Sequence, residues 1–379
     1  MTEGSGPRRL LFVSTSAGED SVAAEIIRRL PPGFIVEAYP AIGEGTAYHG
    51  LCAIVGPRAL PPRWRRARFS VPHDFGLGNA RAFWPGVQFL RRVRKSYDRV
   101  IVVGDIAALA GCWAAGIGNA VFLDLHRTGH GRPYTAIERQ LIGRTAALVF
   151  CRHEDLAKAL RADGRDARSV GNVLMDCVPH GDYDAMSRRT RPTAVTLLPG
   201  SRAGNSESFA LQINALRALP PEDRPDIFLA VAGSVSIDDL ARAAKLHRSG
   251  LLTGQSADLS TLRDEQLTVH MARGSALGNL IEASDIVLSQ ADTATVQAVG
   301  LGRPVISFRT FRDRGARYRD EQGLYGIARI VTLPDVQSVS QALRVLLVNA
   351  DERARIGALG AERVGGAGAI QDVVDAIVG

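Results

Sequence analysis

Two successive series of short β-branched runs, each alternating with segments of helical period, constrain the fold of this chain most strongly. Such alternation is typical of a parallel sheet with helices on both faces. The first series begins with Arg9–Ser14 and the second with Thr193–Leu198, and a polar stretch at 179–192 separates them. We therefore predict an α/β fold of two doubly wound, Rossmann-like domains, 1–178 and 192–379, facing each other across a cleft. For the last helix, at 369–378, we also consider packing on the N-terminal domain.

Ligands of doubly wound folds bind at the carboxyl ends of the parallel strands, so functional side chains are expected just after each strand. The predicted strands lie at 9–14, 34–38, 99–103, 120–123, 147–151, 167–170, 193–198, 227–232, 267–270, 285–289 and 304–308. The uncharged stretch 106–123 has the length of a membrane span, but it contains three glycines and the polar Asn119. We interpret it as a buried helix followed by a strand.

Composition and charge limit the class of function. The chain has 379 residues, of which 46% are apolar, so it can bury two cores and is not a disordered protein. Its 46 Lys and Arg against 39 Asp and Glu give a net charge of +7, which favours anionic partners. The four cysteines are far apart and form no CxxC pair, so neither a zinc site nor a disulfide framework is indicated. We expect no metal and no cofactor. The apolar run Leu10–Val13 is too short for an export signal, so a cytoplasmic location is expected.

The segment 58–95 carries ten Arg or Lys residues against a single acid, Asp74, and six Trp or Phe residues. Aromatic rings beside cations could stack nucleobases, and they equally suit the interface of an anionic bilayer. A basic folded insertion with neither partner is the third interpretation. We expect an anionic membrane surface rather than nucleic acid, and peripheral association with the inner face of the cytoplasmic membrane.

The strongest local motif lies in Val195–Phe209, where a strand turns through Pro-Gly-Ser-Arg into a helix. Gly200 lets the backbone approach a ligand closely, and the first helical turn after Ser201 offers N–H groups. Arg202 can bind a diphosphate with two parallel hydrogen bonds. The motif predicts an anion-binding turn, with an ordinary strand-to-helix turn as the alternative.

A second strand-turn-helix unit, Ala283–Phe308, places Ser289, Thr293 and Thr295 where its helix should begin. Hydroxyl groups at a helix start either cap the helix or bind a phosphate and a ribose. Both interpretations stay open on the residues alone.

Two loops with carboxylates follow predicted strands of the first domain. Gly18, Glu19 and Ser21 lie between the first strand and the first helix, where Glu19 serves either the helix dipole or a ligand. Asp105 follows the strand 99–103, and a partly buried carboxylate there is a candidate base or acceptor-orienting group.

The loop Leu125–Tyr134 follows another strand and clusters His126, Arg127, His130 and Arg132. Metal ligation by its two histidines would lack a third ligand at a familiar spacing. Binding of an acceptor phosphate and a solvated loop without function are the remaining interpretations.

Six segments, in this order along the chain, resemble lipid-A-disaccharide synthase and, more closely, the related branch of the two-domain GT-B glycosyltransferases. They are SAGEDS (16–21), AIGEGTAY with IVGPR (41–48 and 54–58), VVGDIAALA (102–110), SVGNVLMD (169–176), LLPGSR (197–202) and ASDIVLSQADTATVQAVGLGRPV (283–305). The resemblance covers nearly the whole chain and is more specific for fold than for substrate.

The resemblance implies that the C-terminal domain binds a uridine-diphosphate sugar, with the diphosphate on Arg202 and the Thr293-Ala294-Thr295 turn and the ribose near Gln297. It implies that the N-terminal domain binds the acceptor, with Glu19 and Asp105 at the positions of the family's functional carboxylates.

Two positions depart from the family's pattern, because Asp292 and Gln297 stand where the family usually has Gly and Glu. A carboxylate at 292 would repel a nearby diphosphate, and Gln297 offers a ribose diol only weaker, neutral hydrogen bonds. Donor binding is the step that these two differences affect.

We predict an inverting glycosyltransferase that moves a sugar from a UDP-sugar to a lipid-linked or otherwise anionic acceptor, with Asp105 or Glu19 as base. The predicted acceptor-binding residues are Gly18, Ser21, His126, Arg127 and Arg132. A nucleotide-sugar 2-epimerase of the same fold is the nearest alternative, because VGNVLMD (170–176) also suits that family. A non-catalytic protein that binds nucleotide or nucleic acid is the alternative from another class.

Overall fold

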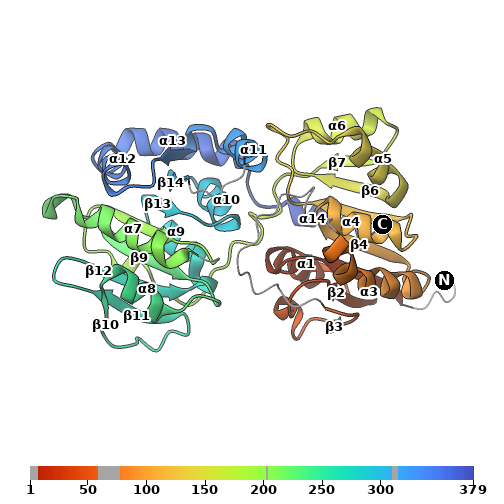
Figure 1. Ribbon diagram of the computed structural model, residues 1–379, viewed down its shortest axis with the longest axis horizontal. Coiled ribbons are helices and arrows are strands. Elements are labelled where there is room, and N and C mark those ends of the chain that lie inside the picture. The colour runs from red at the N-terminus through yellow and green to blue at the C-terminus, as the bar shows by residue number, and fades with distance from the viewer. Residues whose placement is uncertain (1–6, 59–76, 202–203, 310–314) are drawn as a thin grey trace. The chain divides into compact units, whose positions relative to one another are not determined.

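The computed structural model describes residues 7–58, 77–201, 204–309 and 315–379, apart from the side chains of 77–83, 316 and 317. The described chain divides into two compact units. The first comprises Met1–Cys177, Arg319–Glu321 and Ala367–Gly379, and the second comprises Val178–Tyr318 and Gln322–Gly366. Each unit contains one sheet with helices against both of its faces (Figure 1).

The sheet of the first unit has, among the described residues, seven parallel strands in the order β3-β2-β1-β4-β5-β6-β7. Their bounds are β1 Arg8–Ser14, β2 Phe34–Pro40, β3 Ala53–Ile54, β4 Arg99–Gly104, β5 Ala120–Asp124, β6 Ala146–Cys151 and β7 Ala167–Ser169. The strands predicted for this unit are confirmed, whereas the two-residue β3 was not predicted. β1 lies inside the sheet, and its apolar run Leu10–Val13 is buried on both faces.

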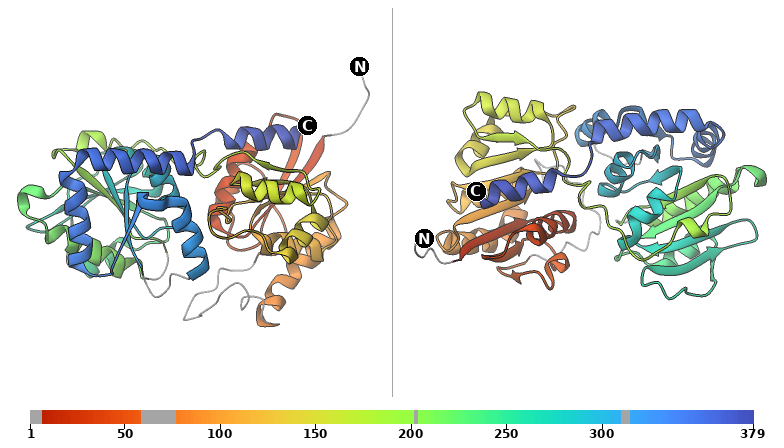
Figure 2. Two further views of the ribbon diagram at one scale, coloured as in Figure 1. Left: turned by 90° about the horizontal axis from the view of Figure 1, so that it is seen from above. Right: turned by 180° about the vertical axis from the view of Figure 1, so that it is seen from behind.

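Helices cover both faces of this sheet. Successive strand residues point to opposite faces, so Leu11 of β1 shares a core with Leu109 and Leu156 from helices on one side. The bounds are α1 Ala17–Arg29, α3 Leu77–Val93, α4 Ile106–Ala114, α5 Ala136–Thr145, α6 Glu154–Ala162 and α14 Ala369–Val378, with a short turn η1 at Thr46–Tyr48. α1 and α14 contact each other and lie side by side in Figure 2.

Helix α14 belongs to the first unit although it ends the chain. Asp176 accepts hydrogen bonds from the backbone N–H groups of Gly368 (2.8 Å) and Ile370 (3.2 Å), where this helix begins. Arg99 donates to the carbonyl oxygens of Ala376 (2.9 Å) and Ile377 (3.0 Å), where it ends. These bonds satisfy groups that helix ends leave unpaired, so α14 is anchored at both termini.

The sheet of the second unit has, within the described residues, the strand order β10-β11-β12-β9-β8-β13-β14-β15. The bounds are β8 Ala194–Leu198, β9 Asp226–Val231, β10 His247–Ser249, β11 Asp258–Arg263, β12 Thr268–Arg273, β13 Ile286–Ser289, β14 Val305–Phe308 and β15 Arg329–Thr332. Six of these described strands run parallel, as predicted for a doubly wound sheet. β10 and β11 are antiparallel, and neither they nor β15 were predicted.

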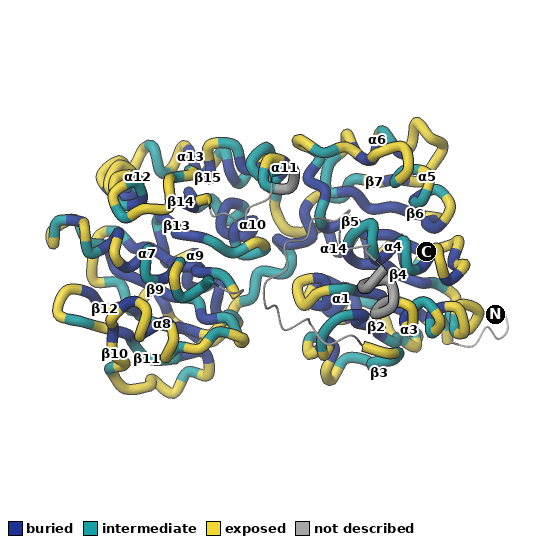
Figure 3. The backbone as a smooth tube through the Cα atoms, viewed as in Figure 1, coloured by how far each residue is buried: buried dark blue, intermediate teal, exposed yellow. Residues whose placement is uncertain are grey.

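The remaining helices are α7 Asn205–Arg217, α8 Ile237–Ala244, α9 Leu277–Glu282, α10 Thr293–Gly300, α11 Gly315–Tyr325, α12 Val336–Val348 and α13 Ala350–Val364. Short 3-10 turns lie at Met186–Arg188, Pro221–Asp223, Gly274–Ala276 and Gly326–Ala328. Strands inside the two sheets, such as β5 and β13, are buried along their whole length (Figure 3).

The uncharged stretch 106–123 forms α4 and then β5, which confirms the predicted helix and strand. Within the part of the chain that the structure describes, no helix combines the length and apolar character that crossing a membrane requires.

Candidate functional site

The carboxyl ends of β1, β4 and β5 are neighbours in the first sheet, and three predicted side chains meet there. Glu19 lies in the first turn of α1, Asp105 caps the start of α4, and His126 follows β5. The ring nitrogen Nε2 of His126 lies 2.8 Å from Glu19 Oε1. Residues that are more than 100 positions apart in sequence therefore form one cluster, as expected for the carboxyl edge of a parallel sheet.

Both oxygens of the buried Glu19 carboxylate are engaged. Its Oε2 accepts hydrogen bonds from the backbone N–H (2.6 Å) and the hydroxyl (2.7 Å) of Thr15, while Oε1 faces His126. A Cβ at Gly104 would lie 3.0–3.1 Å from the Glu19 carboxyl group, so glycine permits the close approach of β4. Held in this way, Glu19 is suited to orient His126.

Asp105 presents a more open carboxyl group. Its Oδ1 accepts hydrogen bonds from the backbone N–H groups of Ala107 (2.9 Å) and Ala108 (3.1 Å), and no described residue donates to its other oxygen. Burial raises the pKa of Asp105, a protonated His126 and the two N–H groups oppose this, and Glu19 raises the pKa further. A carboxylate with an open oxygen and a raised pKa can accept a proton from a substrate hydroxyl.

Asp124 organises the loop that carries His126, a role that the sequence analysis missed. Its Oδ1 accepts hydrogen bonds from the backbone N–H groups of His126 (2.9 Å) and Arg127 (3.2 Å), and its Oδ2 accepts one from the Tyr134 hydroxyl at 2.6 Å. The available signal was its position, because Asp124 ends β5 much as Asp105 follows β4.

Arg127, a predicted acceptor-binding residue, is buried within the same loop. Its guanidinium donates to the carbonyl oxygens of Arg132 (3.3 Å) and Pro133 (2.9 Å) and forms an ion pair with Glu138. These bonds hold the shape of the loop, and contact between Arg127 and an acceptor stays a prediction.

The other predicted acceptor residues are accessible. Gly18 and Ser21 are exposed near the start of α1, where the Ser21 hydroxyl donates to the Ala17 carbonyl at 3.0 Å. Arg132 is half-buried in the loop after β5. Their contacts with an acceptor stay predictions.

A buried chain of hydroxyl and carboxyl groups lies behind this edge and was not predicted. The Ser14 hydroxyl donates to Asp20 Oδ1 at 2.6 Å and lies 2.7 Å from the Tyr48 hydroxyl. Burial raises the pKa of Asp20 to about 6, although the Ser14 hydrogen bond lowers it, and the charge of Glu19 raises it further. Asp20 and Tyr48 lie in two of the motifs of the resemblance, but nothing in one sequence indicates that they meet.

In the second unit, the turn after β8 and the turn after β13 lie side by side. These strands are parallel neighbours with Leu198 opposite Ser289, and the Gln290 N–H donates to the Leu198 carbonyl at 2.8 Å. Gly200 has φ +91°, and a Cβ there would lie 3.1 Å from the Gln290 carbonyl oxygen. Because a side chain would be strained and crowded at this position, the turn requires glycine.

The start of α7 completes this edge. Ser201 is exposed, and Gly204, with φ +93°, precedes the helix without a capping side chain. The first N–H groups of α7 are therefore not occupied by a side-chain cap. Arg202 lies outside the described residues, so its contact with a diphosphate stays a prediction.

Ser289 and Thr295 are buried and bonded within their own turn. Their hydroxyl oxygens lie 2.6 Å apart, and the Thr295 hydroxyl also donates to the Ala291 carbonyl. These bonds shape the turn before α10, but no described side chain caps this helix, so the predicted capping is not observed. Thr293 and Ala294 are half-buried in the first turn of α10, and all four contacts with a donor stay predictions.

The two positions that depart from the family's pattern differ in burial. Asp292 is exposed at the residue before α10 and does not cap the helix, whereas Gln297 is buried one turn later. Solvent around an exposed carboxylate weakens its repulsion of a nearby anion. Placement of a ribose near Gln297 stays a prediction.

The basic segment 58–95 is described only in part, because 59–76 and the side chains of 77–83 lie outside the described residues. Further along α3, Trp84 is 56% exposed, Arg91 and Arg92 are exposed, and Leu90 is buried in the core. The predicted membrane contact of this segment stays a prediction.

The first unit also has a cavity of about 800 Å³, whose lining includes none of Glu19, Asp105 and His126. It lies between α14 and the strands β5 to β7, and its lining includes Arg99, Phe150, Arg168 and Asp375. Among the described residues, no group of three His, Cys, Asp or Glu side chains could hold a metal ion.

No family model and no curated protein matches this chain, but solved structures match nearly its whole length. A putative UDP-N-acetylglucosamine 2-epimerase from Listeria monocytogenes has a TM-score of 0.67 at 15% identity, covering 99% of this chain and 96% of its own. A UDP-GlcNAc 2-epimerase from Neisseria meningitidis bound to UDP-GlcNAc has a TM-score of 0.58 at 12% identity, covering 98% and 99%. The glycosyltransferase SnogD from Streptomyces nogalater has a TM-score of 0.56 at 17% identity, covering 98% of each chain.

These likenesses show the fold. The chain has two Rossmann-like α/β domains of the GT-B type, which glycosyltransferases and 2-epimerases share, so the predicted fold class is confirmed. At these identities, the activity and the finer resemblance to lipid-A-disaccharide synthase remain matters for proposal.

Proposed function

We propose that this protein is an inverting glycosyltransferase, similar to lipid-A-disaccharide synthase, that moves a sugar from a UDP-sugar to a lipid-linked or otherwise anionic acceptor. The observation that carries the proposal is the adjacency of the two turns after β8 and β13, where Gly200 closely approaches the Gln290 carbonyl. The two turns offer one continuous patch of small residues and backbone groups for a diphosphate.

The donor diphosphate would bind at these turns in the second unit. The uncapped N–H groups at the start of α7, the Thr293 hydroxyl and Arg202 would contact its oxygens. Because negative charge grows on the leaving diphosphate as the bond breaks, these donors stabilise the transition state more than the ground state. The UDP-GlcNAc bound to the Neisseria epimerase, which has the same fold, supports a uridine nucleotide.

Asp105 of the first unit is better suited to be the base than Glu19, because both Glu19 oxygens are already engaged. The acceptor hydroxyl oxygen attacks the anomeric carbon, and its proton passes to the Asp105 carboxylate. The bond from the anomeric carbon to the phosphate oxygen breaks, and its electron pair leaves with UDP. Attack opposite the leaving group inverts the anomeric carbon. Glu19 acts by holding His126, which helps to bind the acceptor.

The test measures UDP released from a panel of UDP-sugars, with and without a membrane lipid extract as the source of acceptor. We expect release that requires both a donor and the extract. The matched variant Asp105→Asn keeps the cap of α4 and should melt at the same temperature without releasing UDP. Absence of release with every donor, or release that needs no acceptor, would contradict the proposal.

A nucleotide-sugar 2-epimerase is the second candidate, favoured by the TM-score of 0.67 with the Listeria structure. Inversion of the carbon beside the anomeric centre breaks a C–H bond there, whereas sugar transfer leaves every C–H bond intact. Incubation of UDP-GlcNAc with the membrane lipid extract in heavy water, followed by proton NMR, separates the two. Deuterium at carbon 2 indicates the epimerase, and UDP release with the proton retained indicates the transferase.

A further inference from the structure

Gln290, the residue after β13, joins three strand ends at the carboxyl edge of the second sheet. Its backbone N–H donates to the Leu198 carbonyl at the end of β8 at 2.8 Å. Its side-chain amide makes two hydrogen bonds with the last residue of β14, in which Oε1 accepts from the Phe308 N–H at 3.1 Å and Nε2 donates to the Phe308 carbonyl at 2.8 Å. The end of β14 is therefore held beside the two turns of the proposed donor site.

Arg309 follows Phe308 and places a positive charge at this edge. β14 is the parallel neighbour of β13, and neighbouring strands lie about 4.8 Å apart, so Arg309 begins about one strand spacing from the turn after β13. Its side chain is exposed, and it forms no ion pair with any described residue. A guanidinium in this position can bind phosphate oxygens through two parallel hydrogen bonds.

An aromatic ring of α11 supports the Arg309 side chain. The Cζ atom of Arg309 lies 5.5 Å from the centre of the Tyr318 ring. The Cζ atom of Arg329 lies 4.5 Å from the centre of the same ring and 4.6 Å from that of Tyr325. Arg329 is buried and donates to Gln322 Oε1 at 2.7 Å, so this group of side chains has a fixed base. Contact with a ring restricts the Arg309 side chain and leaves its charge available to a ligand.

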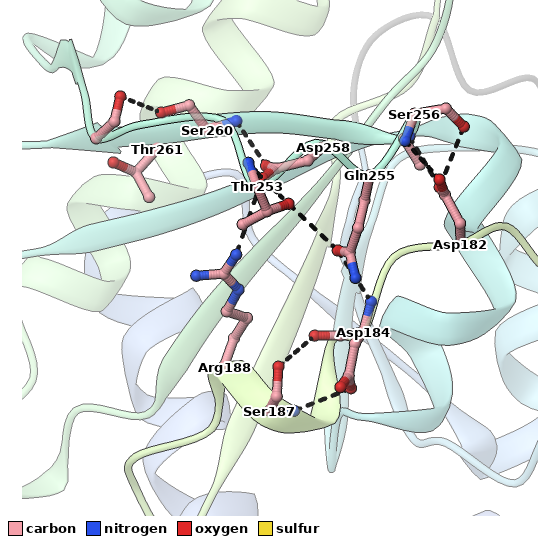
Figure 4. Close-up of polar contacts among 12 residues, drawn as sticks. Asp182, Asp184, Ser187, Arg188, Thr253, Gln255, Ser256, Asp258, Ser260 and Thr261 are labelled. Carbon is pink, nitrogen blue, oxygen red and sulfur yellow. Dashed lines mark hydrogen bonds and ion pairs between the residues drawn. The ribbon is translucent and has the colours of Figure 1, made fainter.

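The two arginines near the β12 end of the same edge are engaged by the loop between β10 and β11. Figure 4 shows Arg188 beside Asp258, with charged atoms 3.8 Å apart. Arg273, the last residue of β12, donates from Nε to the Ser256 carbonyl at 3.2 Å. A second acid, Asp182, accepts a hydrogen bond from the Ser256 hydroxyl at 3.1 Å. Carboxylates therefore offset the positive charge at this end, whereas the cation after β14 has no such partner among the described residues.

We infer that Arg309 is a second cation of the proposed donor site, in addition to Arg202, and that it binds the diphosphate of the nucleotide. The inference rests on the proposed function, because it concerns the same donor site. A diphosphate carries more negative charge than one guanidinium offsets, so a second guanidinium strengthens binding without contacting the base. Gln290 is a positioning residue, since its side chain holds the end of β14 and thereby Arg309. The site would select nucleoside diphosphates over nucleosides.

The test is calorimetric titration of the full chain with UDP. Arg309→Gln removes the charge and keeps a hydrogen-bond donor, and the UDP affinity should fall at least about tenfold, the usual loss of a charge-assisted hydrogen bond. Arg309→Lys keeps the charge without the planar fork and should lose less. The control Arg248→Gln removes an exposed cation from β10 and should bind UDP like the wild type. Equal melting temperatures show that the variants are folded.

Gln290→Met tests the positioning role. The change removes both hydrogen bonds to Phe308 and should weaken UDP binding by about threefold to tenfold while Arg309 is present. In the Arg309→Gln background it should cost less than about twofold, because the group that it positions is already absent. Losses that add in the double variant would overturn the positioning role of Gln290.

Uridine distinguishes phosphate binding from a change in the shape of the site. Its affinity, measured by ligand-observed NMR, should change less than about twofold in Arg309→Gln, because uridine has no phosphate. An equal loss of UDP and uridine affinity, or an unchanged UDP affinity in Arg309→Gln, would overturn the inference alone. A wild-type chain that binds no UDP would contradict the proposed donor site and the inference together.

Discussion

The carboxyl edges of the two sheets are built from opposite chemistry. In the first unit the edge carries titratable side chains, Glu19, Asp105 and His126, each fixed by hydrogen bonds to its surroundings. In the second unit the described edge carries mainly glycine, hydroxyl and backbone groups, with the exposed Asp292 before α10, and Gly200 and Gln290 bring two turns together.

This difference indicates a division of work within one repeated fold. A carboxylate cluster can move protons, whereas a patch of N–H and hydroxyl groups can bind an anion without changing its own protonation state. The two sheets share a topology that places both kinds of group at strand ends, and the side chains there decide which task each unit performs.

The variant Asp105→Asn tests most directly whether the two edges perform different tasks. Removal of the proposed base should lower turnover by about 10²–10⁴-fold, because that is the usual contribution of a positioned acid or base. Binding of UDP, measured by calorimetry, should not change. An equal loss of UDP binding would contradict the division, because Asp105 would then support the donor site.

Asp20→Asn tests whether burial of the ionised Asp20 carboxylate lowers the stability of the protein. Burial raises the pKa of Asp20 from 3.8 to about 6, so the folded state holds this proton more tightly than the unfolded state. Stability from this group is present below about pH 4 and is lost as pH rises to about 6, by up to about 3 kcal/mol. Asn cannot ionise and keeps an acceptor for Ser14.

Asp20→Asn should therefore be more stable than the wild type at about pH 7.5, and the gap should close near pH 4. The free energies of unfolding of the two proteins in urea, determined at both pH values, measure this gap. A variant that is less stable at every pH would show that the Ser14–Asp20 bond outweighs the cost of burying the charge.

Gly200→Ala is the corresponding change at the second edge. The positive φ and the contact of 3.1 Å with the Gln290 carbonyl should cost about 1–2 kcal/mol of stability and weaken UDP binding by on the order of tenfold. The matched control is Gly233→Ala, which follows β9 and has no atom within 4 Å of an added Cβ. Equal UDP affinities for the two variants would show that the turn after β8 does not belong to the donor site.

His126→Gln should have the smallest effect. Glutamine can still donate to Glu19 but carries no charge, so the KM for an anionic acceptor should rise by about threefold to tenfold while kcat changes little. Steady-state kinetics with varied acceptor separate the two constants. A fall in kcat at unchanged KM would assign His126 to the chemistry instead of to binding.

Much of the fold could be predicted because buried parallel strands are continuous apolar runs. Leu10–Val13 and Val100–Val103 are such runs, and strands of the first sheet were predicted from their positions. β10 and β11 could not be predicted in this way, because the edge strand His247–Ser249 is polar and mostly exposed and its neighbour Asp258–Arg263 is not a continuous apolar run. The two-residue β3 is shorter than any pattern can indicate.

Most of the predicted site residues of the first unit follow strand ends, although Asp124 at the end of β5 was missed, and the buried contacts behind this edge were not predicted. Glu19, Asp105 and His126 each follow a strand, so their convergence at one edge could be expected. The contact between Tyr48 and Ser14, through which Asp20 is buried, joins a short turn to the end of β1. No periodicity in the sequence reports such a contact, because it depends on how α1 and η1 pack.

The adjacency of the turns after β8 and β13 as a diphosphate site is the claim on which the sugar-transfer account depends. Its most direct measurement is the melting temperature of the full chain with the diphosphates of uridine, guanosine, adenosine and thymidine. A ligand that binds only the native state raises this temperature, so the account predicts a selective rise with uridine diphosphate that Gly200→Ala reduces. No rise with any of the four nucleotides would contradict it.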